Sequence, residues 1–157
     1  MLQKKYDISI RDALREERMQ KRISAAFHFA VGAVGYPLLE LLWRGRTHPS
    51  MALAGGAVML YASLLAYRPM RGIERSILIT LFTLLVELLL GVVFNIWLGC
   101  NVWDYSRFRV HFLGQICPVY AALWFLLSFP IACFTRKSTA VLHHLICRIQ
   151  KCKQAKM

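Results

Sequence analysis

Hydrophobic residues along this chain gather into four long runs, and short polar segments separate them. About 20 residues of α-helix, at about 1.5 Å of rise each, cross the roughly 30 Å hydrocarbon core of a bilayer. Three runs have that length, and the second, with 17 residues, reaches it if its helix begins early, near His48. The pattern therefore predicts an all-α integral membrane four-helix bundle, with residues 1–157 forming one membrane domain. The predicted spans are residues 23–43, 51–67, 77–99 and 112–134.

The two flanks of this bundle are polar but amphipathic. Residues 1–22 carry charges of both signs at helical spacing, which predicts a short cytoplasmic helix near the lipid surface. In residues 135–157, apolar positions at helical spacing face Lys and Arg. A basic amphipathic segment of this kind typically lies in the membrane interface, so we predict a cytoplasmic interfacial tail.

Two of the predicted spans carry polar and small residues on one helix face. The first has His28, Gly32, Tyr36 and Glu40 at steps of four, and the third has Thr80, Thr83, Glu87, Gly91 and Asn95 at steps of three and four. Residues at these steps share a face, and small ones allow a neighbouring helix to approach closely. The similarity suggests two parallel helical-hairpin repeats. We interpret His28 as a structural or interfacial residue.

Composition and charge agree with a membrane protein. The chain is 57% hydrophobic, with a mean hydropathy of +0.46. Its net charge of +12 would suggest nucleic acid in a soluble protein, but the distribution of the 20 Lys and Arg explains it without one. With both termini in the cytoplasm, sixteen of them lie inside and four outside, which is the positive-inside pattern. We therefore predict cytoplasmic termini and no nucleic-acid partner.

The common catalytic and metal-binding motifs are absent. The chain has no P-loop, no H-E-x-x-H and no G-x-S-x-G, which argues against nucleotide binding by a P-loop, metallohydrolase chemistry and serine-hydrolase chemistry. Five cysteines form no C-x-x-C pair, so we expect free thiols. His143, His144, Cys147 and Cys152 are better explained as interfacial side chains than as a metal set. We expect no enzyme, no catalytic residue, no metal and no cofactor.

A candidate site lies where the first and third spans meet the loop after the third. Ionisable side chains in hydrocarbon are costly and by default face protein or water, so Glu40 and Glu87 mark a sheltered polar strip. These groups line a cavity for a small solute or lipid headgroup, or they only pair helices; Trp103 and Tyr105 also fit interfacial anchors. The candidate ligand-binding residues are Glu40, Arg44, Glu87, Asn95, Trp103, Asp104, Tyr105, Arg109, His111 and Gln115.

The stretch from Glu87 through N-V-W-D-Y-S to G-Q-I-C resembles a known family. It is similar to small bacterial membrane proteins classed as ABC-transporter type IV permeases, and residues 35–56 extend the resemblance, which covers roughly residues 30–130. Where the family usually has Pro-x-Asn, this chain has Arg109-Val-His111. The resemblance implies transport across the bacterial cytoplasmic (inner) membrane.

We therefore expect a multi-pass, permease-like component with an outward-facing polar site. Glu87 is its central carboxylate, and Asn95 and Gln115 form the hydrogen-bonding wall. Because the chain has no nucleotide-binding domain, ATP-driven transport would require a separate ATPase subunit and self-association into a homo-oligomer. Two alternatives stay open: a non-catalytic assembly or sensor subunit, and a small membrane enzyme acting on lipid.

Overall fold

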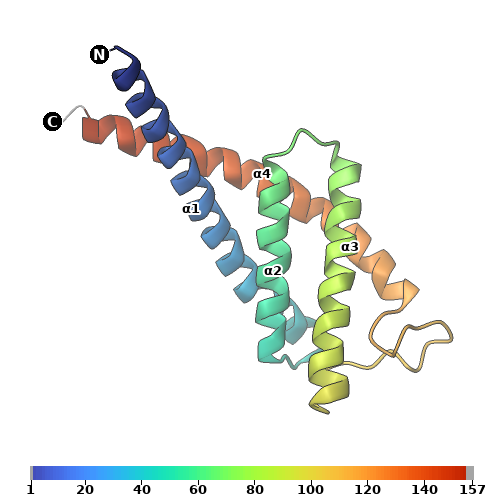
Figure 1. Cartoon of the computed structure of the whole chain (residues 1–157). Coiled ribbons are helices and arrows are strands. Elements are labelled where there is room, and N and C mark those ends of the chain that lie inside the picture. The colour runs from blue at the N-terminus through green and yellow to red at the C-terminus, as the bar shows by residue number, and fades with distance from the viewer. Residues whose placement is uncertain (1, 155–157) are drawn as a thin grey trace.

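Four α-helices and one π-helical segment make up the protein, and the described residues contain no β-strand. The computed structural model describes the backbone of residues 2–154 and the side chains of residues 11 and 14–149. All four helices are long and apolar enough to cross a membrane, which confirms the predicted all-α four-helix membrane bundle. The elements are α1 (Leu2–Arg44), α2 (Pro49–Ala66), α3 (Gly72–Leu90), η1 (Gly91–Trp97) and α4 (Pro118–Gln154) (Figure 1).

The helices run alternately up and down, so both chain ends lie at one end of the bundle. We call this the terminal end; it also carries the loop between α2 and α3. The opposite, distal end carries residues 45–48 and 98–117. Helices α1 and α4 diverge from the α2–α3 pair and continue past it toward the two termini (Figure 1).

Helix α2 begins early, as its short hydrophobic run requires. His48 is its N-cap: the backbone is extended there, and the imidazole Nδ1 accepts the N–H of Ser50 at 3.2 Å. Pro49 occupies the first helical turn, where a missing N–H costs nothing. The prediction that this helix starts near His48 is therefore confirmed.

Both predicted flanking segments belong to longer helices. Residues 2–22 continue into the first span without a break, and residues 135–154 continue from the fourth. The expected separate helix of residues 1–22 is thus the first part of α1, because no Gly or Pro interrupts the helical register. Met1 and residues 155–157, the ends of both predicted flanks, lie outside the described residues.

The fourth helix begins six residues later than the hydrophobic pattern predicts. Leu113 and Gly114 have φ values of 53° and 69°, in the left-handed region, which a right-handed helix cannot contain. Residues 112–116 instead form a tight turn in which Phe112 donates its N–H to the carbonyl of Ile116 at 2.8 Å. The helix then starts at Pro118. Gln115, expected at the start of the helix, therefore lies in the loop.

Close backbone contact joins α1 to α2. A Cβ added at Gly32 would collide with the carbonyl oxygen of Gly55, and a Cβ at Gly55 would collide with that of Gly32. Such small residues let two membrane helices pack at backbone distance, as the sequence predicts for this face. The described residues also form two small apolar clusters, one that includes Val58, Ala62 and Ile79 and one, at the distal end, of Met51, Val102 and Trp103.

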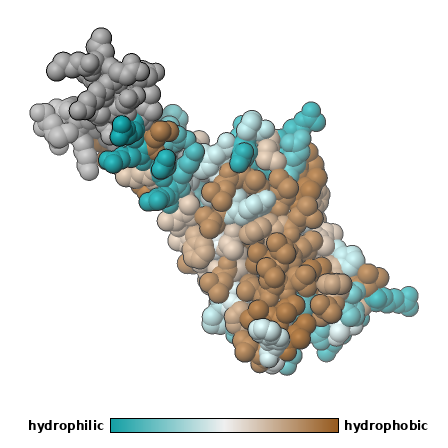
Figure 2. Space-filling view, viewed as in Figure 1, coloured by the Kyte–Doolittle hydropathy of each residue, from teal (hydrophilic) through white to brown (hydrophobic). Residues whose placement is uncertain are grey.

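Much of the outer surface is apolar, as expected for helices facing lipid tails. Exposed side chains include Leu42, Trp43 and Trp97, each more than three-quarters exposed. Figure 2 shows a broad hydrophobic face over the bundle, with hydrophilic residues toward its two ends and on the arm that leads to the termini. This band matches the pattern of a membrane-spanning surface.

Candidate functional site

Glu87 is a buried carboxylate without a hydrogen-bond partner. It lies on α3 with only 7% of its surface exposed, and its Oε2 atom is fully buried and accepts no hydrogen bond. A neighbouring hydroxyl, that of Thr83, donates instead to the carbonyl of Ile79 in its own helix at 2.8 Å. An unsatisfied buried polar atom costs about 1–3 kcal/mol, more if it is charged, so this arrangement calls for a functional explanation.

A cavity of about 290 Å³ between all four helices adjoins Glu87. Its walls are almost wholly apolar, and the Gly32–Gly55 crossing forms one side. Trp124 of α4 also lines it, and its indole Nε1 is a second buried polar atom without a partner. Further lining residues include Tyr36, Leu39, Val58, Met59, Thr83, Leu127 and Ile131.

A second, smaller chamber continues from Glu87 toward the distal end. Its volume is about 30 Å³, enough for a water molecule. The lining is more polar than that of the large cavity, with Tyr36, Glu40, Arg44, Trp103 and Tyr105 beside Glu87. Because Glu87 and Tyr36 line both spaces, they lie between the apolar cavity and the polar chamber.

Glu40, in contrast, is fully paired. Its Oε1 accepts from Arg44 at 2.5 Å, one helical turn further along α1, and its Oε2 accepts from the hydroxyl of Thr47 at 2.7 Å. Arg44 also donates to the carbonyl of Val102 at 2.8 Å, which ties α1 to the distal loop. This cluster satisfies both oxygens of Glu40, while the buried Nε atom of Arg44 has no partner among the described residues, and no member of the cluster bonds to Glu87.

Asn95 holds the distal loop over the end of the bundle. The π-helical segment η1 presents its side chain to residues 102–115; such segments often occur at functional sites. Its amide nitrogen donates to the Trp103 carbonyl at 2.8 Å and to Oε1 of Gln115 at 2.6 Å, and its oxygen accepts the N–H of Val102 at 2.7 Å. The indole N–H of Trp103 donates to the Gln115 carbonyl at 3.2 Å. Asn95 and Gln115 therefore form one network, and Trp103 is buried beneath it.

Tyr105 places a phenol at the loop side of the small chamber. Its ring stacks on that of Tyr120, with centroids 4.5 Å apart, and its backbone N–H donates to the carbonyl of Gly114 at 2.7 Å. Burial raises the pKa of the Tyr105 phenol well above its usual value, and the negative charge of Glu87 raises it further. The hydroxyl therefore stays protonated and can donate a hydrogen bond into the chamber.

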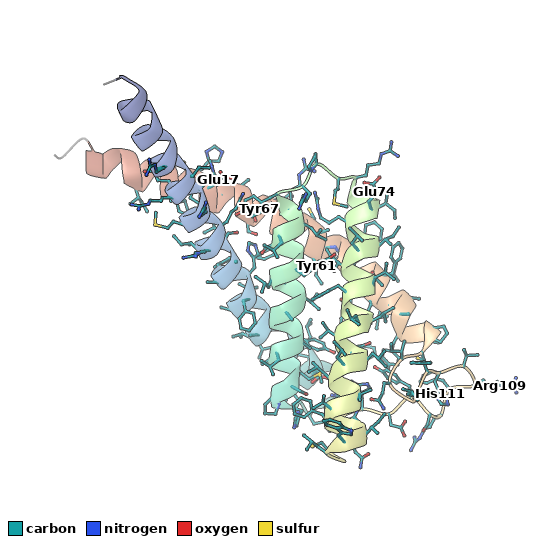
Figure 3. The ribbon with its side chains drawn as sticks, in the orientation of Figure 1. Glu17, Tyr61, Tyr67, Glu74, Arg109 and His111 are labelled. Atoms are coloured by element: carbon teal, nitrogen blue, oxygen red, sulfur yellow. The ribbon has the colours of Figure 1, made fainter. Side chains whose placement is uncertain are left out.

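Three candidate residues lie away from this site. Asp104 is exposed, and both of its carboxylate oxygens accept hydrogen bonds from Ser106 at 2.8 Å. These bonds, first the one from the backbone N–H, lower the pKa of Asp104. His111 accepts the N–H of Gly114 at 3.0 Å, and Arg109 is exposed. Figure 3 shows Arg109 and His111 on the part of the loop that projects away from the helices.

A scan against family models matches residues 47–152 to the family described as "Putative ABC-transporter type IV". The chain belongs to this family. No curated protein and no solved structure matches it significantly. Of the residues that line the cavity and the chamber or hold the distal loop, Glu87, Asn95, Trp103, Gln115 and Trp124 lie in the part of the chain that matches the family. Glu40 and Arg44 precede it.

Two residues of the site, Trp124 and Thr47, are not predicted by the sequence pattern. Trp124 lies six residues into α4, about 9 Å from its start, and in the middle of the predicted span of residues 112–134 rather than at a span end, where Trp usually gathers. That depth was the available signal, because a buried indole N–H needs a partner. Thr47 lies seven residues after Glu40, across the end of α1, and nothing in the spacing indicates their contact.

A second polar cluster, at the terminal end, joins α1 to α4. His28 is fully buried; its Nε2 lies 2.7 Å from the hydroxyl of Ser138, and its Nδ1 lies 2.7 Å from the carbonyl of Ser24. The Ser24 hydroxyl lies 3.4 Å from that of Thr139. Every polar atom of the imidazole thus has a partner, as a structural residue requires.

The cysteines and histidines of the tail do not gather into a metal site within the described side chains. Cys147 and His143 lie one helical turn apart, with 3.9 Å between Sγ and Nδ1. No group of three metal-ligating residues is found there. The side chain of Cys152, the fourth member of the set weighed from the sequence, lies outside the described residues.

Proposed function

We propose that this protein is the membrane component of a transport system and that its ligand binds in the four-helix cavity at Glu87. The observation that carries the proposal is the buried, unpartnered carboxylate of Glu87, which lines both the large apolar cavity and the small polar chamber. Folded proteins rarely keep such a group without a use for it.

The lining of the large cavity favours an amphiphile over a small polar solute. A fully polar solute would lose its hydration against walls such as Leu39, Val58 and Leu127 without regaining hydrogen bonds. An apolar chain fits those walls, and its polar head would lie at Glu87. Of the two ligands considered from the sequence, a small solute and a lipid headgroup, the cavity therefore favours the lipid headgroup.

The two unpartnered atoms define the head of that amphiphile. Glu87 requires a hydrogen-bond donor or a cation, and the indole N–H of Trp124 requires an acceptor. A hydroxyl or amide group meets both demands. The phenol of Tyr105 and the Glu40–Arg44 pair would form the exit toward the distal end.

In this proposal the chain lies in the bacterial cytoplasmic membrane with both termini in the cytoplasm, so the small chamber opens outward. The excess of Lys and Arg in the termini and the α2–α3 loop supports this orientation. The chain performs no catalysis itself, and a separate ATPase subunit provides the energy. Self-association would place several four-helix units around one translocation path.

The matched substitutions Glu87→Gln and Glu74→Gln test the site. Both remove one carboxylate from α3 with little change in size, but Glu74 is exposed at the other end of the helix (Figure 3). The purified full-length chain is extracted, and the lipids bound to it are identified by mass spectrometry. We expect one amphiphile to co-purify with the wild-type chain and with Glu74→Gln, and to be depleted by Glu87→Gln and by Trp124→Phe.

The rival function, a subunit in which these residues only pair helices, has one observation in its favour. Glu40 and Arg44 do pair, and they attach α1 to the distal loop. If Glu87→Gln leaves the amount of bound lipid unchanged but destabilises the protein, the result would support a helix-pairing role and contradict the proposed transport site. Co-purification of an ATPase with the wild-type chain would separately support the transport system.

A further inference from the structure

A further cavity, separate from the two spaces at Glu87, lies at the terminal end between the start of α3 and the middle of α4. Its volume is about 510 Å³. Arg75 and Ser76 line it from α3, and Arg136 and Lys137 line it from α4. Arg75 and Glu87 are twelve residues apart on one helix, or about 18 Å, so the two cavities do not share a ligand group.

Arg75 is a buried cation without a counter-charge. Only 4% of its surface is exposed, its Nε atom is fully buried without a partner, and its one recorded hydrogen bond runs from Nη2 to the carbonyl of Arg68 at 3.2 Å. Among the side chains that the structure describes, no carboxylate lies within ion-pair distance of it. A buried, unpaired charge is strongly unfavourable, so this guanidinium requires an anion.

Ser76, beside Arg75, is the exception among the buried hydroxyls. Every other buried Ser or Thr in the described part of the chain has a hydrogen-bond partner, most often a carbonyl of its own helix, as Thr80 and Ser128 do. The hydroxyl of Ser76 is buried and bonds to nothing. It is therefore free to donate to a ligand in the cavity that it lines.

The remaining surroundings are also positive. Gly72, in the first turn of α3, lines the cavity, so the free amides and partial positive charge of a helix N-terminus face it. Arg136 and Lys137 are exposed at its rim, and no acidic residue lines it. Glu74, the acidic residue in that turn, accepts the N–H of Arg71 at 3.1 Å instead.

We propose that this cavity binds a phosphate group. Its oxygens would accept hydrogen bonds from Arg75, Ser76 and the amides at the start of α3, and Arg136 and Lys137 would neutralise its remaining charge. Phe129 and Ala132 provide an apolar wall on the α4 side, where the glycerol and first methylenes of an anionic phospholipid would lie. Basic pockets between membrane helices bind phospholipid heads in this way. A free phosphate would use the same polar contacts without the apolar wall.

The test uses the purified full-length chain in a non-ionic detergent, titrated with dioleoylphosphatidylglycerol or with inorganic phosphate and followed by native mass spectrometry. We expect Arg75→Gln to weaken phosphatidylglycerol binding by about tenfold or more, since it removes charge-assisted hydrogen bonds. Arg68→Gln is the matched control: it removes the same charge from an exposed side chain near the cavity that does not line it. It should change binding less than about twofold.

Each outcome decides the proposal. Equal loss in Arg75→Gln and Arg68→Gln would show general attraction to a basic surface and overturn the site, as would no binding of either anion by the wild-type chain. A third outcome is that inorganic phosphate binds in an Arg75-dependent way and at least as tightly as phosphatidylglycerol. The cavity would then be a phosphate site, and its ligand would not be a phospholipid. If Arg75→Gln does not fold, exposed Lys137→Gln is compared with exposed Arg148→Gln on the same helix; only the former should weaken binding.

Discussion

Glu87 on α3 and Trp124 on α4 line the same cavity, and each holds a fully buried polar atom without a hydrogen-bond partner, Oε2 in the first and Nε1 in the second. One is an acceptor and the other a donor, and both lie at a wall that is otherwise apolar. The indole N–H of Trp124 lies near the Glu87 carboxylate, but no hydrogen bond of normal geometry joins them. Such a pair of unsatisfied groups is what a site that binds its ligand by hydrogen bonds must keep available.

Removing the carboxylate should therefore make the protein more stable. Glu87→Leu deletes an unsatisfied acceptor and adds apolar contact, so we expect the free energy of unfolding to rise by about 1–3 kcal/mol. Glu40→Leu is the control and should lower it by about 1–3 kcal/mol, because Arg44 loses its partner. Both are measured by equilibrium unfolding in mixed micelles. A loss of stability in Glu87→Leu would mean that the carboxylate has a partner in the folded protein.

The glycine contact between α1 and α2 allows a comparison within one helix. A Cβ at Gly32 meets the backbone of Gly55 and the Cβ of Met59, whereas a Cβ at Gly35 meets nothing within 4 Å. We expect Gly32→Ala to destabilise the protein by about 1–3 kcal/mol through overpacking. Gly35→Ala should be neutral or stabilising by up to about 1 kcal/mol, since Ala favours helix. Thermal unfolding in detergent measures both, and equal effects of the two substitutions would contradict the close crossing.

The Asn95 network predicts how the distal loop opens. Asn95→Ala removes three hydrogen bonds to residues 102, 103 and 115, so residues 98–117 should separate from the bundle more often. Cys117 reports this opening because it is buried, 1% exposed, while Cys100 is exposed. We expect maleimide to modify Cys117 at least about tenfold faster in Asn95→Ala, as a loss of roughly 1.4 kcal/mol of local stability implies. The rate at Cys100 should stay unchanged.

The matched control for that loop is Arg109→Ala, which changes an exposed residue of the same segment that forms no side-chain hydrogen bond or ion pair within the described part of the chain. It should leave the modification of Cys117 at the wild-type rate. If Arg109→Ala accelerates the reaction as much as Asn95→Ala does, the loop is not held by the Asn95 network.

Asp104 predicts a pH dependence at the loop surface. Its hydrogen bonds from Ser106 favour the ionised form, so its pKa lies below the ordinary aspartate value of about 3.9. Because this pKa is lowered on folding, the turn at 104–106 is supported at neutral pH and loses that support as pH falls through the pKa of Asp104. We expect the carboxyl ¹³C resonance of Asp104 to titrate at a lower pH in the wild-type chain than in Ser106→Ala. Equal titration midpoints in the two proteins would contradict the hydrogen bond from the Ser106 hydroxyl to Asp104.

Much of the fold follows from hydrophobic periodicity, and the exceptions have local causes. The four spans and the early start of α2 were predictable because the length of a membrane helix is set by the bilayer. The late start of α4 was not, because Leu113 adopts a left-handed conformation that a non-glycine residue rarely takes. Residues 112–117 are mostly apolar, so they looked like the beginning of a span.

The candidate site was predictable where one helix carried the signal. Glu87 and Asn95 are conspicuous as polar residues in an apolar run; Glu87 lies in the bundle interior and Asn95 bonds to the distal loop. The neighbours of Glu87 depend on how four helices pack, so Trp124 could not be assigned to it from the sequence. Arg109 and His111 are polar residues of the same loop, but the turns of the loop direct that segment outward.

The buried cluster around His28 leads to a last prediction, on how α1 and α4 are held together. Both ring nitrogens of His28 have partners, and Ser138 and Thr139 provide the α4 side of the cluster. His28→Ala should lower the free energy of unfolding by about 2–4 kcal/mol, since it leaves a cavity and removes the hydrogen bond between α1 and Ser138 of α4. His144→Ala, which changes an exposed histidine of α4, should stay within about 0.5 kcal/mol. Because α1 and α4 diverge from the other helices toward the terminal end, a spin-label pair at Ala26 and Ala140 should also report a broader distance distribution in His28→Ala alone. An unchanged distribution together with lost stability would place the role of His28 within α1 rather than between the two helices.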